Sequence, residues 1–184
     1  IAHFGIPTGG VGDPGPTVGG KKVDGIDGIR KPVSLEIAVD ERDHVLDLRS
    51  LLGNKAIAKP AINLNALGLG FGSEDQFLQL ARAFEDTGVS AYSGAAPLIQ
   101  SHDIVGYAAR ILAVEGYHAG NIRLMAALKG LSTFKVDSKD VLPPPSGPKY
   151  FFTDSQALAI PRTVAEVIAI VKPFFPDGLN GNIK

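Results

Sequence analysis

Two short stretches decide the fold, Glu41-Arg42-Asp43-His44 and Glu115-Gly116-Tyr117-His118. Each places a glutamate three residues before a histidine, and an arginine, Arg49 or Arg123, follows five residues after each histidine. Side chains three residues apart lie on the same face of an α-helix. The chain contains only six glutamates and four histidines. The repeat therefore predicts two helices that each present a carboxylate and an imidazole side by side.

Length and composition are typical of a single globular domain. The chain has 184 residues, a formal net charge of -1 and no cysteine. A chain of this size buries about 70% of its unfolded surface and needs no disulfide bonds. Without cysteine, thiolate metal sites and thiol catalysis are excluded. Positive and negative charges are mixed, so nucleic-acid binding is not expected, and no apolar run approaches the ~20 residues of a membrane span.

The first 31 residues are expected to form a loop, because they contain nine glycines and show no helical period. Within them, Gly10-Val11-Gly12-Asp13-Pro14-Gly15 has the glycine spacing of a dinucleotide-binding motif. No predicted strand precedes it, and Pro14 stands where a helix should begin. Nucleotide binding is therefore not expected from this stretch.

Three long helices are predicted between residues 32 and 130. Their boundaries are marked by a proline in a first turn, by serine caps and by glycines after a last turn. The first two predicted ranges are 32–52 and 73–97, and the third helix, with Ser101 or Asp103 as its cap, runs to 128. Gly53 and Gly130 are the C-terminal glycines.

The remainder is predicted to contain little regular structure. Prolines make 141–148 a loop, and the aromatic stretch within 150–160 is expected to form a strand or hairpin. A capping box predicts a short helix over 163–171, after which Phe174 and Phe175 are expected to cover an edge of the core. The expected organisation is an N-terminal loop (1–31), a helical bundle (32–130) and a C-terminal extension (131–184).

Ionisable residues interrupt the apolar stripe of each long helix. The stripes consist of positions 37, 41, 44, 48 and 52, then 78, 81, 85, 88 and 92, then 108, 111, 115, 118, 122 and 125. An unpartnered buried carboxylate costs several kcal/mol, and Glu41, Glu85 and Glu115 would also repel one another. Two divalent cations would compensate their charges.

The ligand pattern matches one known arrangement of helices. In ferritin-like di-iron and di-manganese bundles, a glutamate from each of two helices joins a Glu-x-x-His from each of two others. This chain supplies both Glu-x-x-His pairs and one isolated glutamate, Glu85. The sequence thus predicts three of the four bundle helices, and the helix with the remaining glutamate is expected to precede residue 1.

Several stretches resemble the ferritin-like proteins grouped as desiccation-related proteins. They are Asp40–Val45, Leu48–Gly53, Ala58–Leu64, Phe84–Leu98, Ile111–Arg123, Arg162–Thr163 and Phe174–Ile183. The resemblance implies an all-α, ferritin-like four-helix bundle with a loop-rich C-terminal extension, and an exported protein. It also implies two divalent metal ions, iron or manganese, with five candidate ligands: Glu41, His44, Glu85, Glu115 and His118.

Two functions of different classes fit these features. The first is a di-metal carboxylate protein with a stress-protective redox or metal-handling role, which includes a di-metal oxidase or a peroxide-consuming enzyme. Oxygen and nitrogen ligands without sulfur suit iron or manganese, while zinc is not excluded. The second is a structural or assembly protein on the same scaffold with a vestigial metal site. In either case a homo-oligomer or larger assembly is expected.

The singled-out residues also have purely structural interpretations. The Glu-x-x-His pairs could form buried salt-bridge networks with Arg49 and Arg123, and Glu85 could be a surface residue. Tyr92 and Tyr117 are expected to be core residues with a hydrogen-bonded hydroxyl rather than redox groups.

Overall fold

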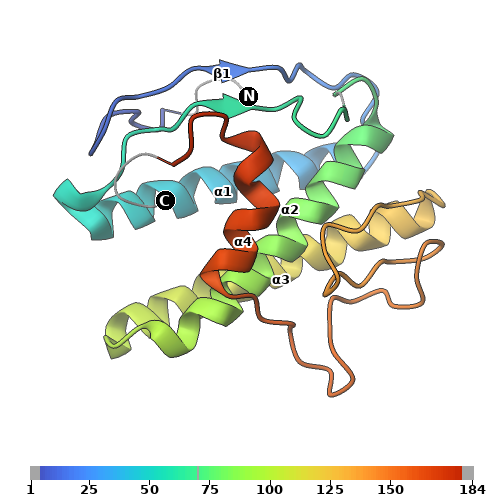
Figure 1. Ribbon diagram of the computed structural model, residues 1–184. Coiled ribbons are helices and arrows are strands. Elements are labelled where there is room, and N and C mark those ends of the chain that lie inside the picture. Colours follow the sequence, from blue (N-terminus) through green and yellow to red (C-terminus); the bar gives the residue numbers. More distant parts are fainter. Residues whose placement is uncertain (1–4, 70, 180–184) are drawn as a thin grey trace. The chain divides into compact units, whose positions relative to one another are not determined.

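The computed structural model describes residues 5–69 and 71–179, so the first four residues of the predicted N-terminal loop lie outside it. Helices provide nearly all the regular structure of the described residues, which confirms the predicted all-α class (Figure 1). The chain forms two compact units, one of residues 1–74 with 171–184 and one of residues 75–170. The division expected from the sequence, at residues 31 and 130, stays a prediction.

The first unit is built around α1 (Arg30–Leu52). This helix begins two residues before the predicted start and ends at Gly53, whose φ of 54° lies in the left-handed region and whose N–H donates to the Arg49 carbonyl. Glycine adopts this conformation without a steric penalty, so the predicted C-cap is confirmed. The helix continues into a short 3-10 turn, η1 (Gly53–Lys55).

The glycine-rich N-terminal segment runs alongside residues 56–64. Strands β1 (Thr17–Val18) and β2 (Ile62–Asn63) pair in parallel, with Thr17 opposite Ile62. A Cβ on Gly15 would lie only 2.3 Å from the Ala61 nitrogen, so glycine permits this close backbone approach. The sequence predicted an unpaired loop here, because the segment lacks the alternating pattern that indicates a strand.

Burial along α1 is uneven. Ile37 is buried and Glu41 and His44 are half-buried, but Leu48 and Leu52 are exposed by 36% and 51%. The prediction of a continuous core-facing stripe is therefore wrong at the C-terminal end of this helix. An apolar stripe becomes buried only where another element covers it, and in the described part of the chain these two leucines remain open to solvent.

The second unit contains α2 (Glu74–Ala95), whose first residue belongs to the first unit, and α3 (His102–Leu128). The two helices are joined through η2 (Ala96–Leu98) and lie against each other (Figure 1). The Ser101 hydroxyl caps α3 by accepting from the Ile104 N–H at 3.4 Å. Gly130 closes α3 with a φ of 64°, and its N–H donates to the Ala127 carbonyl. Of the two candidate N-terminal caps, Ser101 is therefore the one used, and the predicted C-terminal glycine is confirmed.

Residues 131–162, hereafter the arm, pack back onto α2 and α3. Val89 of α2, Ala119 of α3 and Phe152 of the arm form a buried apolar cluster. An isolated antiparallel bridge joins Thr153 to Ala159, within the stretch where a strand or hairpin was predicted. The arm leads into α4 (Val164–Val171) and a final 3-10 turn, η3 (Lys172–Phe174), in which Phe174 is buried.

Candidate metal centre

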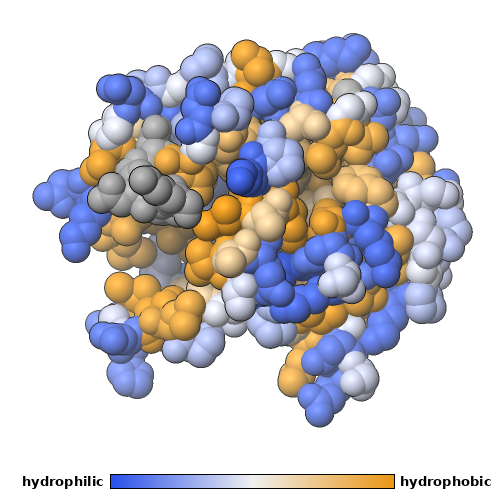
Figure 2. All heavy atoms as spheres, in the orientation of Figure 1, coloured by the Kyte–Doolittle hydropathy of each residue, from blue (hydrophilic) through white to orange (hydrophobic). Residues whose placement is uncertain are grey.

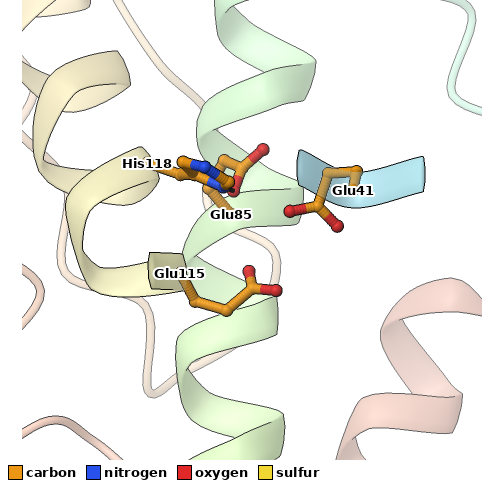
Figure 3. A group of neighbouring side chains, drawn as sticks. All are labelled: Glu41, Glu85, Glu115 and His118. Carbon is orange, nitrogen blue, oxygen red and sulfur yellow. Dashed lines mark ion pairs between the residues drawn. The ribbon is translucent and has the colours of Figure 1, made fainter. Parts of the chain in front are cut away.

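Three of the predicted ligands meet in the second unit. Glu85 comes from α2, and Glu115 and His118 come from α3, with only 8%, 4% and 5% of each residue exposed. Each offers a ligand atom, and these atoms lie within 4.8 Å of one another. Glu115 and His118 point from α3 toward α2 (Figure 3). The interpretation of Glu85 as a surface residue is wrong.

His118 is held beside Glu85. Its Nδ1 lies 3.4 Å from the Oε2 atom of Glu85. The predicted stripe of α3 explains why, because Ile111, Glu115, His118, Ile122 and Met125 are all buried on one side of the helix. Positions 115 and 118 therefore deliver two polar groups to the same buried strip, as the i, i+3 spacing requires.

Gly88 makes room for the Glu115 carboxylate. It lies one turn after Glu85 on α2, and a Cβ built there would be 2.3 Å from Oε2 of Glu115. Glycine inside a helix costs about 1 kcal/mol relative to alanine, so its presence has a packing reason. The carboxylate and imidazole donors suit iron or manganese, and the space at Gly88 accommodates one of them. The residues present thus fit a bound metal ion.

The other Glu-x-x-His pair lies in the first unit, on α1, and Figure 3 labels its glutamate. Nδ1 of His44 is 3.4 Å from Oε1 of Glu41, and the two side chains are 13% and 42% exposed. The predicted side-by-side geometry of this pair is therefore present. That Glu41 and His44 complete one centre with the other three residues stays a prediction.

The two arginines that follow the motifs bind main-chain carbonyls. Arg49 donates to the Ile57 carbonyl at 2.8 Å and to the Gly9 carbonyl, which ties α1 to loops of its own unit. Arg123 donates to Oδ2 of Asp86 at 2.7 Å and to carbonyls of the arm. These contacts differ from the alternative prediction, in which both arginines form salt bridges with the Glu-x-x-His pairs.

Asp86 is a residue that sequence reasoning missed, because the predicted stripe of α2 passes through Glu85 and not through its neighbour. Its carboxylate receives Nη1 of Arg123 at 2.7 Å and Nη1 of Arg82 at 3.3 Å. Burial raises the pKa of Asp86 to about 6, while the positive charges of Arg123 and Arg82 act in the opposite direction. Two signals were available in the sequence: its position directly after Glu85, and its i, i+4 spacing from Arg82.

Tyr117 corrects another expectation. The prediction placed it in the core, but 68% of it is exposed. It precedes His118 by one residue, and successive residues of an α-helix are rotated by about 100° around the axis. Tyr117 is therefore turned away from the buried strip that holds Glu115 and His118. Tyr92 of α2, by contrast, is half-buried.

The sequence model of the family described as "Ferritin-like domain" matches residues 19–128, well over half of the chain. The chain belongs to the ferritin-like family. The matched range contains all of α1, α2 and α3, and so all five predicted ligands. No curated protein and no solved structure matches the chain. In this ferritin-like chain, the buried glutamate and histidine cluster is compatible with the di-metal carboxylate scaffold of the family.

Among the helices of the described residues, none combines the length and the hydropathy needed to cross a bilayer.

Proposed function

We propose that this ferritin-like chain is a di-metal carboxylate protein that binds iron or manganese and has a stress-protective redox or metal-handling role. The observation that carries the proposal is the buried group of Glu85, Glu115 and His118, whose ligand atoms lie within 4.8 Å of one another. Two carboxylates and an imidazole gathered away from water are costly for a fold to maintain. A divalent cation bound between these side chains would neutralise the carboxylates and offset that cost.

In the proposed centre, α3 supplies Glu115 and His118, α2 supplies Glu85, and α1 supplies Glu41 and His44. Two Glu-x-x-His pairs and a glutamate from a further helix correspond to three of the four ligand-bearing helices of the ferritin-like di-metal arrangement. Support for the contribution of α1 comes from its own pair, in which Nδ1 of His44 lies 3.4 Å from Oε1 of Glu41.

Iron or manganese bound in such a centre supplies redox chemistry with dioxygen or peroxide. The part played by the chain is to hold the donors ready. Burial shields Glu115 and His118 from bulk water, and the 3.4 Å approach of Glu85 orients the His118 ring.

Metal analysis of protein purified without chelators tests the proposal. We expect about two iron or manganese ions per chain, as in di-metal carboxylate bundles, and loss of most of this metal in Glu115→Ala and His118→Ala. Glu36→Ala is the matched control, because Glu36 is an exposed glutamate of α1. A wild-type protein that holds less than about one ion per chain, even after reconstitution, would contradict a di-metal site.

We further propose that the chain is of the desiccation-related type and is exported. The resemblance over Phe84–Leu98 and Ile111–Arg123 supports this assignment. Fractionation of cells that produce the protein from its own gene tests the location. Recovery in the extracellular or periplasmic fraction is expected, and recovery only in the cytosol would contradict it.

A second function, as a structural or assembly protein, is favoured by apolar side chains on the outer side of α3. Tyr117, Leu124 and Leu128 are 68%, 46% and 79% exposed. Figure 2 shows hydrophobic residues interspersed with hydrophilic ones on the face that it draws. Light scattering combined with metal analysis separates the two functions. A large assembly that takes up no metal after reconstitution would favour the structural one.

A further inference from the structure

We propose that Arg123 is a positioning residue, which holds α3 in register on α2 and thereby sets where Glu115 and His118 lie relative to Glu85. The inference rests on the proposed metal function, because it concerns the geometry of the same ligands. Arg123 is completely buried, yet its side chain carries a permanent positive charge. The contacts of the guanidinium group explain why a charged side chain with several N–H donors is buried at this position.

The contact of Arg123 with Asp86 joins the two ligand-bearing helices. Nη1 of Arg123 donates to Oδ2 of Asp86 at 2.7 Å. Asp86 directly follows Glu85 on α2, and Arg123 lies five residues after His118 on α3. A charge-assisted hydrogen bond therefore joins the two helices directly beside Glu85 and little more than one helical turn from His118.

Two further close approaches cross between the same helices. Glu85 meets His118 at 3.4 Å, and the Glu115 carboxylate occupies the space beside Gly88. A slip of one helix by one residue would displace its ligands by about 1.5 Å. Metal–ligand distances tolerate only about 0.2 Å. An interaction that prevents such a slip in the metal-free protein is therefore needed to keep the ligands in place for metal binding.

The guanidinium of Arg123 is held against Asp86, because three of its other four N–H donors are engaged as well. They donate to the carbonyls of Val141 at 2.8 Å, Lys149 at 2.7 Å and Tyr150 at 2.7 Å, all in the arm. A planar fork with five N–H donors can make all four contacts at once, whereas the single ammonium of lysine cannot. The arm thus fixes Arg123, and Arg123 fixes the two helices.

Asp86 is held from a second side. Arg82 donates to Asp86 at 3.3 Å and to Asp140 of the arm at 2.8 Å. The two buried arginines and two buried aspartates carry equal and opposite charges, so the link needs no metal for its own neutrality. It is therefore present in the metal-free protein, as a positioning role requires.

Arg162 provides a matched control. It is 2% exposed and donates to Asp137 at 2.8 Å and 2.7 Å and to the Ser90 hydroxyl at 2.8 Å. The contact with Ser90 ties the arm to α2, and those with Asp137 lie within the arm. Arg162→Lys therefore removes a comparable buried fork, while the Arg123 link between α2 and α3 stays in place.

The experiment compares Co²⁺ binding by the full chain, as wild type, Arg123→Lys and Arg162→Lys, well below the melting temperature of each. Calorimetric titration gives the dissociation constant, and the visible absorption of Co²⁺ reports its coordination. Arg123→Lys is expected to weaken binding about 10- to 100-fold and to alter the spectrum, which is the usual effect of losing a group that orients ligands. Arg162→Lys is expected to lower the melting temperature while leaving the dissociation constant and spectrum close to those of wild type.

A second pair of variants decides the question if Arg123→Lys does not fold. Asp86→Asn keeps an oxygen acceptor for Arg123, and Asp86→Ala removes it. A positioning role predicts that Asp86→Asn binds Co²⁺ clearly more tightly than Asp86→Ala. Equal affinities in this pair would overturn the role.

The outcomes separate the inference from the function on which it rests. A wild-type protein that binds none of Co²⁺, iron or manganese overturns the metal function and the inference together. A wild-type protein that binds Co²⁺, with Arg123→Lys equal to it in affinity and spectrum, overturns the inference alone. The inference is also overturned if Arg123→Lys and Arg162→Lys lose Co²⁺ affinity to the same extent for the same fall in melting temperature.

Discussion

Gly88 lies one turn after Glu85 on α2, and the Glu115 carboxylate occupies the space that a side chain at Gly88 would fill. Gly88→Ala should therefore move that carboxylate and weaken metal binding at least tenfold, about 1.4 kcal/mol. The free energy of unfolding of the metal-free protein should change little, because the better helix propensity of alanine, about 1 kcal/mol, offsets the cost of displacing the carboxylate. Titration with Mn²⁺ and urea unfolding of the metal-free protein measure the two quantities.

Gly106→Ala is the control for this prediction. Gly106 lies in α3, and a Cβ there would meet no atom within 4 Å. The substitution should leave Mn²⁺ affinity unchanged and stabilise the helix by up to about 1 kcal/mol. Equal Mn²⁺ affinities for Gly88→Ala and Gly106→Ala would show that the space at Gly88 has no part in binding.

Glu166 in the first turn of α4 makes stability depend on pH. The hydrogen bond from Lys139, and then those from the N–H and hydroxyl of Thr163, lower the pKa of Glu166 from 4.5 to about 2. A lowered folded-state pKa gives stabilisation that is complete above pH 4.5 and disappears as the pH falls toward about 2. The urea midpoint of Glu166→Gln should thus lie below that of wild type at pH 7.

At pH 2 this difference in urea midpoint between wild type and Glu166→Gln should have largely vanished. Lys139→Met removes the largest cause of the shift, since Nζ of Lys139 lies 2.9 Å from the Glu166 carboxylate. It should therefore reproduce the loss at pH 7. A difference between wild type and Glu166→Gln that is as large at pH 2 as at pH 7 would contradict this explanation.

At the scale of elements, the arm is bonded directly to the backbone of α2. The Arg162 N–H donates to the Ser90 carbonyl at 3.0 Å, and a Cβ on Gly94 would lie 1.8 Å from the Arg162 carbonyl oxygen. Because the obstructing atom is backbone, Gly94→Ala should push the arm away and destabilise the fold by about 1–3 kcal/mol, as overpacking does. Urea unfolding measures this loss, and a Gly94→Ala protein as stable as Gly106→Ala would contradict the close approach.

The helices could be predicted from sequence because their boundaries depend on neighbouring residues. Gly53, Ser101 and Gly130 end or begin helices where the sequence predicted, each through a hydrogen bond to a residue within five positions. The β1–β2 pairing was missed, since it joins residues more than forty positions apart and no local period indicates it.

The candidate site divides in the same way. Helical spacing was sufficient to predict that Glu115 and His118 share a buried face and that Glu85 lies on the apolar stripe of α2. The partners of Arg123 could not be predicted, because three of its four contacts are carbonyls of an irregular arm, and a carbonyl is present at every residue. The residue type at a position therefore does not indicate whether its carbonyl accepts a hydrogen bond from Arg123.

For the whole molecule, a bound metal should raise stability by mass action, because the unfolded chain does not gather the ligands. Mn²⁺ at one hundred times its dissociation constant should stabilise the folded protein by about 2.7 kcal/mol. Differential scanning calorimetry should show a higher melting temperature that EDTA reverses. Glu115→Gln should abolish this rise, and a rise of equal size in that variant would indicate binding elsewhere.

The family match ends at residue 128, but several hydrogen-bond acceptors of the buried arginines lie beyond that residue. Arg82 and Arg123 of α2 and α3 depend on oxygens contributed by Phe134, Asp140, Val141, Lys149 and Tyr150. A chain shortened at the family boundary would lose all of these acceptors and would leave both guanidinium groups sharing the Asp86 carboxylate. The smallest fragment worth expressing from this half of the protein therefore extends through residue 170, whatever the sequence match suggests.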